Sequence, residues 1–156
     1  MKLKGYIKNK MKKILYIDMD NVLVDFPSSF SKIDNNILEK YETNKDDIPG
    51  IFSLMKPIDG AIDAFNILSE IYDTYILSTA PWDNPTAWSD KLQWVKEYLG
   101  KNAYKRLILS HHKNLNKGDF LIDDRTKNGA DKFDGKLLLF GSEQFPNWAS
   151  VLKYLQ

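Results

Sequence analysis

The stretch that decides the fold is Ile14-Leu15-Tyr16-Ile17-Asp18-Met19-Asp20-Asn21-Val22, in which an apolar run leads directly into two aspartates. The run is continuous rather than alternating, and this is typical of a parallel strand that helices cover on both faces. Similar apolar runs recur along the chain at residues 74–77, 107–109, 120–122 and 137–140. We therefore expect a parallel sheet with the first run as one of its strands.

Segments with helical periodicity separate these runs. Apolar residues recur at helical spacing in 61–72, 90–99 and 148–155, and Gly100 is a natural C-terminal stop for the second of these segments. Strands that alternate with helices predict an α/β fold. The expected architecture is a three-layer, Rossmann-like core.

Residues 26–57 break this alternation. They contain weak helical signals, a polar run at 42–47 and then Pro49-Gly50. Because they lie between the first strand and the next helix, we interpret them as a small helical cap inserted after strand one. Residues 11–25 and 58–156 then form the core domain, and the lysine-rich residues 1–10 are expected to be a flexible N-terminal extension.

Composition excludes several classes of function. The formal net charge of +1 provides no global field that would recruit a nucleic acid polymer. The chain has no cysteine, which excludes disulfides and thiolate chemistry and fits a reducing, cytoplasmic location. No apolar run approaches the roughly 20 residues that span a bilayer, so no membrane association is expected.

Polar clusters follow four of the predicted strands. They are Asp18 with Asp20, Ser78-Thr79, Lys113 and Asp123-Asp124. In an open parallel sheet, ligands bind outside the carboxyl ends of the strands. We therefore expect the four clusters to meet in one site.

The residue types in these clusters suit phosphoryl transfer. Asp18 can attack phosphorus, and Asp20 would point to the same side in extended chain, where it can act as general acid and base. Ser78 or Thr79 can donate to phosphoryl oxygens, and Lys113 supplies positive charge.

The aspartates also predict a cation. Two carboxylates about 4 Å apart repel by roughly 4 kcal/mol at an effective dielectric near 20, and one lysine cannot offset four of them. Either some carboxylates stay protonated or a cation binds. Oxygen ligands together with a phosphate substrate favour Mg²⁺.

The order of these motifs resembles that of the haloacid-dehalogenase-like hydrolases. Within that superfamily the chain is similar to the 5'(3')-deoxyribonucleotidases, and the matching blocks are DMDNVLVDF (18–26), PIDGA (57–61), KLQWVKEYLG (91–100) and LIDDR (121–125). The resemblance implies a magnesium-dependent phosphatase that forms a phospho-aspartate. Its expected substrate is a deoxyribonucleoside 5'- or 3'-monophosphate.

Carried over residue by residue, the resemblance implies Asp18 as nucleophile and Asp20 as acid and base. Magnesium would be held by Asp18, the carbonyl of Asp20 and the Asp123-Asp124 pair. Phe26 would stack on the nucleobase. Phosphate would be bound by Ser78, Thr79, Lys91 and Lys113.

The chain also departs from the family. Asn21 stands where many members have glycine, the cap is short, and the loop 82–88 is longer and more aromatic. Substrate specificity is therefore open at the sequence level. Another small phosphate ester, such as a sugar phosphate, or a non-catalytic nucleotide-binding module are the alternatives.

Several residues allow two readings. Phe52, Trp82 and Trp88 line the substrate pocket or pack within the protein, and Lys91 is a phosphate ligand or a surface lysine. We interpret His111-His112 as positioning residues beside Lys113, and Trp94 and Trp148 as core. Asp25 and Arg125 either support the site or face solvent, and the chain is either a monomer or a homodimer.

Overall fold

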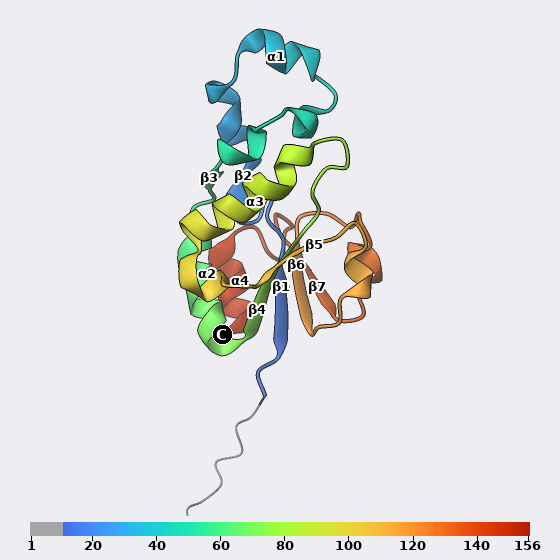
Figure 1. Ribbon diagram of the computed structural model, residues 1–156. Helices are drawn as coiled ribbons and strands as arrows, with labels where there is room; N and C mark the ends of the chain where they lie inside the picture. The colour runs from blue at the N-terminus through green and yellow to red at the C-terminus, as the bar shows by residue number, and fades with distance from the viewer. Residues whose placement is uncertain (1–10) are drawn as a thin grey trace, which may run out of the picture.

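A five-stranded parallel sheet forms the centre of the computed structural model, which describes residues 11–156 (Figure 1). The strand order is β5-β4-β1-β6-β7, and every neighbouring pair is parallel. This confirms the predicted α/β fold; the predicted extension, residues 1–10, lies outside the described residues. The strands are β1 (Ile14–Ile17), β4 (Asp73–Ser78), β5 (Leu107–Leu109), β6 (Phe120–Asp123) and β7 (Lys136–Leu139).

Each face of the sheet has its own apolar cluster, because successive strand residues point to opposite faces. Leu15 and Ile17 of β1 pack into the larger cluster with the helices α2 (Ala61–Ile71), α3 (Pro85–Tyr98) and α4 (Trp148–Leu155). Tyr16 packs into a smaller cluster with Ala130 and Phe133. Ala130 begins the short turn η6 (Ala130–Lys132), and Phe133 follows it. The continuous apolar pattern of β1 thus reflects burial on both faces, as predicted.

The segment between β1 and α2 extends beyond the carboxyl edge of the sheet (Figure 1). Its neck is an antiparallel pair of short strands, β2 (Val24–Asp25) and β3 (Lys56–Pro57). We propose that it is the predicted cap, 26–57. It is built mainly of 3-10 turns, with one short α-helix: η1 (Phe26–Lys32), α1 (Asn35–Lys40), η2 (Lys45–Asp47) and η3 (Ile51–Ser53).

The start of α3 fastens this segment to the core. The buried side chain of Asn84 donates to the carbonyls of Asp46 at 2.8 Å and Ile48 at 3.0 Å. The N–H of Gly50 donates to Thr86 Oγ1 at 2.9 Å. The helix begins at Pro85, five residues before the predicted start at 90, because proline at the first helical position has the required φ and needs no donor.

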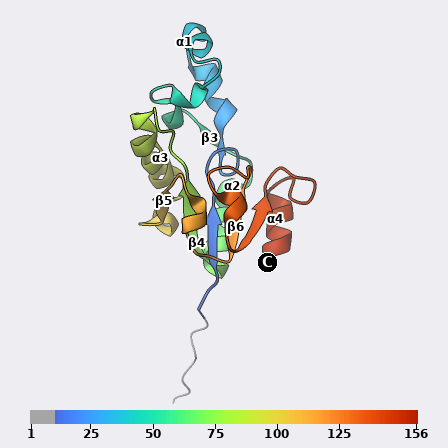
Figure 2. The same ribbon diagram turned by 90° about the vertical axis from the view of Figure 1, so that its right-hand side faces the viewer.

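The last helix, α4, supports the carboxyl edge of the sheet. Its first turn has a reciprocal capping box between Asn147 and Ser150. It packs near the β7 end of the sheet (Figure 2). There the ring centroids of Phe140 and Trp148 lie 5.2 Å apart. Trp148 Nε1 donates to the carbonyl of Val22 at 2.8 Å, so the helix holds the loop that follows Asp20.

Trp94 and Trp148 are both about 3% exposed, which confirms their assignment to the core. None of the helices within residues 11–156 combines the length and apolar character needed to cross a membrane.

Replacing Trp148 by Phe should lower the free energy of unfolding by about 1–3 kcal/mol. The substitution removes the indole donor and leaves the buried Val22 carbonyl without its partner. Urea unfolding measures the effect, and Tyr154→Phe, at a half-exposed position of the same helix, is the matched control. Equal stability of the two variants would show that the indole hydrogen bond does not hold the loop.

Candidate active site

A tight turn after β1 presents the first two aspartates. The N–H of Asp18 donates to the carbonyl of Ile122 at 2.9 Å, and the carbonyl of Met19 accepts three N–H groups from residues 22–24. Asn21 has a φ of 59°, in the left-handed region that asparagine tolerates better than most residues. This explains why Asn21 can occupy the position where many members of the similar 5'(3')-deoxyribonucleotidase family have glycine.

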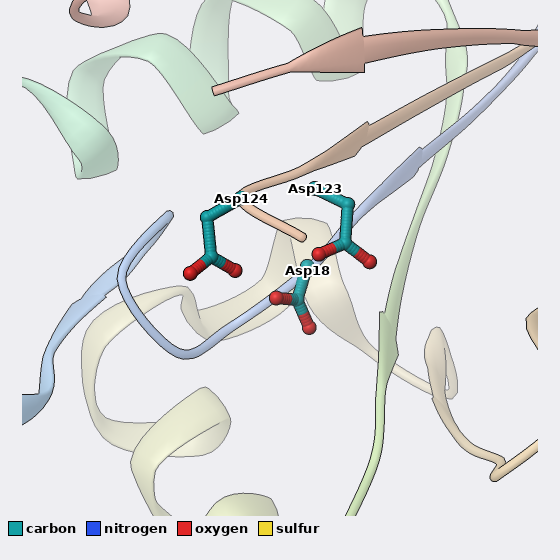
Figure 3. A group of neighbouring side chains, drawn as sticks. All are labelled: Asp18, Asp123 and Asp124. Carbon is teal, nitrogen blue, oxygen red and sulfur yellow. The ribbon is translucent and has the colours of Figure 1, made fainter. Parts of the chain in front are cut away.

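Three carboxylates meet where β1 and β6 end (Figure 3). Oxygen atoms of Asp18, Asp123 and Asp124 all lie within 4.8 Å of one another. Asp18 and Asp123 are almost fully buried, and Asp124 Oδ1 is a buried oxygen without a hydrogen-bond partner among the described residues. The predicted convergence of the first and last motifs is therefore present in the structure.

Lys113 lies between two of these carboxylates. Its Nζ is 2.9 Å from Asp18 Oδ1 and 2.6 Å from Asp123 Oδ2, and the side chain is only 4% exposed. The Lys113 N–H donates to the carbonyl of Asn128 at 2.7 Å, which fixes the turn η5 (Lys113–Leu115) below the site. One buried ammonium thus forms ion pairs with a carboxylate of the first motif and a carboxylate of the last.

The charges in this cluster do not balance. Burial raises the pKa of Asp18 despite the opposing effect of Lys113. Burial, and then repulsion by Asp18 and Asp123, raises the pKa of Asp124 to about 7. Burial acts to lower the pKa of Lys113, but Asp18 and Asp123 outweigh it and raise that pKa.

The cluster fits a hard divalent cation. All of its donors are carboxylate oxygens, the ligands that Mg²⁺ prefers, and within residues 11–156 the buried Asp124 Oδ1 has no hydrogen-bond partner. A bound cation would also offset the excess negative charge of the three carboxylates. The Asp20 carboxylate does not belong to this cluster. This does not contradict the prediction, which named the backbone carbonyl of Asp20 as the magnesium ligand.

Asp20 instead pairs with Lys91. The Lys91 ammonium is 3.1 and 3.0 Å from the two Asp20 oxygens and 3.0 Å from Ser78 Oγ. Lys91 is fully buried and lies in the middle of α3, so the reading as a surface lysine is wrong. Burial raises the pKa of Asp20, and the positive charge of Lys91 opposes this shift.

A pocket of about 500 Å³ opens beside Asp20. Phe26 lines it from the cap, Trp82 and Thr79 from the segment between β4 and α3, and His111 from the segment after β5. The Thr79 hydroxyl donates to the carbonyl of Ser110 at 2.7 Å. The remaining lining residues are Asp20, Asn21, Lys45, Asp46, Pro81, Arg125, Lys127 and Asn128.

Two of the four aromatic candidates do not line this pocket. Phe52 is 2% exposed and packs under Phe26, with ring centroids 5.8 Å apart. Trp88 belongs to α3 and lines a separate groove beside β5. His111 lies edge-on to Trp82, with ring centroids 5.9 Å apart, so its predicted positioning role has an aromatic partner that the sequence did not indicate.

Sequence reasoning also missed Asp46 and Asn84. Asp46 reaches the pocket from the cap, and burial raises its pKa. Asn84 is a buried amide that joins the cap to the core. A polar run and a loop asparagine carry no signal for either role, since both roles depend on contacts between segments far apart in the chain.

Comparisons with known proteins identify the family of this chain. The profile of the family described as "5' nucleotidase, deoxy (Pyrimidine), cytosolic type C protein" matches residues 47–148. The "Putative 5'(3')-deoxyribonucleotidase" of Vibrio phage KVP40 is 59% identical over 95% of this chain and 87% of its own. The human "5'(3')-deoxyribonucleotidase, cytosolic type" is 31% identical over 67% of this chain and 47% of its own.

Solved structures with the same fold are more distant in sequence. The "putative HAD-hydrolase YfnB" of Bacillus subtilis, solved with bound magnesium, has a TM-score of 0.59 and 14% identity over 88% of this chain and 90% of its own. The haloacid dehalogenase-like protein SP0104 of Streptococcus pneumoniae has a TM-score of 0.53 and 16% identity over 92% and 90%. The chain therefore belongs to the 5'(3')-deoxyribonucleotidase family of phosphatases, on the haloacid-dehalogenase-like fold.

Proposed function

We propose that this enzyme hydrolyses deoxyribonucleoside 5'- or 3'-monophosphates through a phospho-aspartate on Asp18, with Mg²⁺ as cofactor. The observation that carries the proposal is the meeting of Asp18, Lys113 and Asp123-Asp124 beside a pocket with aromatic walls. The names of the relatives support the substrate class.

In the first step, an Asp18 oxygen attacks phosphorus and the bond from phosphorus to the ester oxygen breaks. Asp20 gives its proton to the leaving oxygen. In the second step, water attacks the phospho-aspartate, Asp20 takes the proton of that water, and inorganic phosphate leaves as the Asp18 carboxylate reforms. The two aspartates suit these separate roles because Asp18 lies against Lys113 and Asp20 lies against Lys91.

Asp18, the carbonyl of Asp20 and the Asp123-Asp124 pair would hold the magnesium ion. When bound, the ion supplies positive charge that neutralises the phosphoryl oxygens and the carboxylates around them. The magnesium-bound structure of YfnB supports this choice of cofactor. Ser78, Thr79, Lys91 and Lys113 stay the predicted phosphate-binding residues.

The nucleoside would occupy the pocket between Phe26 and Trp82. A volume of about 500 Å³ falls within the range of roughly 300–1,000 Å³ that is usual for small-molecule sites. The exposed ring of Trp82 and the half-buried ring of Phe26 offer stacking surface on two sides. A cytoplasmic location, and a monomeric or homodimeric state, stay predictions.

Asp18→Asn should lower phosphate release by on the order of 1,000-fold or more, because it removes the nucleophile while keeping the shape of the side chain. The assay measures phosphate release from deoxyribonucleotides, ribonucleotides and sugar phosphates, each with Mg²⁺ and with chelator. Asp63→Asn, at an exposed position of α2, is the control. Release led by a sugar phosphate would overturn the substrate class, and normal turnover by Asp18→Asn would overturn the mechanism.

Phe26→Ala and Trp82→Ala should each raise KM for nucleotides by roughly tenfold, because stacking on a base contributes about 1–3 kcal/mol. KM for a small sugar phosphate should change little. Tyr104→Ala removes an exposed ring that lies outside this pocket and serves as the control. An unchanged nucleotide KM in both pocket variants would place the base elsewhere.

Without metal, the free energy of unfolding should fall as the pH rises from about 4 to 7. The folded chain keeps the Asp124 proton up to about pH 7, whereas the ordinary pKa of an aspartate is 3.8, so the folded state binds more protons across this window. Urea unfolding with chelator measures the slope, which Asp124→Asn should make shallower. Added Mg²⁺ should raise stability at neutral pH, and an unchanged slope in Asp124→Asn would contradict the assignment.

A further inference from the structure

We propose that Phe52 of the cap is a positioning residue: the face of its ring holds the Lys91 ammonium against Asp20, and Phe52 thereby orients the general acid and base. The inference rests on the proposed function, in which Asp20 transfers the proton. It differs from a stacking role for Phe52, because the ring lies under Phe26 and not on the pocket wall.

Lys91 is enclosed by protein groups. Its side chain is fully buried, so water does not solvate the ammonium. Both Asp20 oxygens and Ser78 Oγ accept hydrogen bonds from it at 3.0–3.1 Å. The centroid of the Phe52 ring lies 4.4 Å from Nζ, within the range of a cation–π interaction.

Phe52 lies in η3, which follows Gly50, and the Gly50 N–H is bonded to Thr86 at the start of α3. The same helix carries Lys91. The hydrogen bond from Gly50 to Thr86 therefore helps to hold the ring in place relative to the ammonium.

The Phe52 ring packs against the ring of Phe26 and also lies next to the Lys91 ammonium. A nucleoside stacked on Phe26 would therefore affect the position of the Phe52 ring, and through it the position of Lys91. The cap would affect the chemical step through this contact, and not only through binding.

The test replaces Phe52 with 4-fluoro-, 3,5-difluoro- and 3,4,5-trifluorophenylalanine. These rings keep nearly the same shape while the negative charge on the ring face decreases. We expect kcat to fall stepwise, by roughly tenfold for the trifluorinated ring, with KM within about twofold of the wild-type value. In a Lys91→Met background the same series should have no further effect on kcat. Phe65, which is fully buried in the core away from the site, receives the same fluorination as a control for packing.

Each outcome is informative. A flat series in an active wild-type enzyme refutes the inference, as does an equal fall of kcat in the Phe65 series. A rise in KM at constant kcat would refute it as well, because Phe52 would then act on substrate binding and not on proton transfer. No phosphate release by the wild-type chain with Mg²⁺ would refute the proposed function, and the inference with it.

Discussion

The ion pairs from Lys113 to Asp18 and Asp123 are the interaction on which the catalytic edge depends. They join the ends of β1 and β6 to the turn after β5, in a site where all three side chains are almost fully buried. Removing one partner from a buried pair leaves an uncompensated charge and typically costs about 3–5 kcal/mol. The lysine therefore holds together three segments that the sheet alone would only bring near one another.

A second buried lysine separates the two aspartates of the first motif. Asp18 and Asp20 are two residues apart, yet Asp18 belongs to the cluster with Lys113 and Asp20 pairs with Lys91. Two carboxylates in different surroundings can take different roles, one as nucleophile and one as proton carrier. The division is made by α3 and by the turn after β5, and not by the loop that carries the aspartates.

The sequence predicts the sheet and the motifs well because both signals are local. Apolar runs on both faces of the sheet and polar residues at strand ends need no knowledge of distant contacts. The pairing of Lys91 with Asp20 carries no such local signal, because the two residues lie 71 positions apart in the chain. A signal for the burial of Lys91 was present all the same: Ala87, Lys91, Trp94 and Val95 recur at helical spacing, and this is the buried face of α3.

The two tryptophans of the aromatic loop 82–88 have different surroundings, which the sequence analysis did not distinguish. Pro85 marks the first position of α3, so Trp82 stays in the loop at the pocket while Trp88 turns with the helix toward another groove. Proline at a helix start is a recognised signal, and it could have separated the two tryptophans. The hydrogen bonds of Asn84 to the cap could not have been predicted, since they depend on how a segment 36–38 residues away folds back.

The packing of the cap limits how it can move. Ile48, Ile51 and Met55 lie in the same buried cluster as the core helices, and Trp94 Nε1 donates to the carbonyl of Met55 at 3.1 Å. Lifting this part of the cap would expose those side chains and break the bonds of Asn84, at a cost of about 1.5–3 kcal/mol for each large apolar side chain. Substrate entry through the open pocket beside Asp20 avoids that cost. Cap and core are therefore packed together around the site, and in the role that we propose for Phe52 the cap would influence chemistry through its contact with Lys91 of α3.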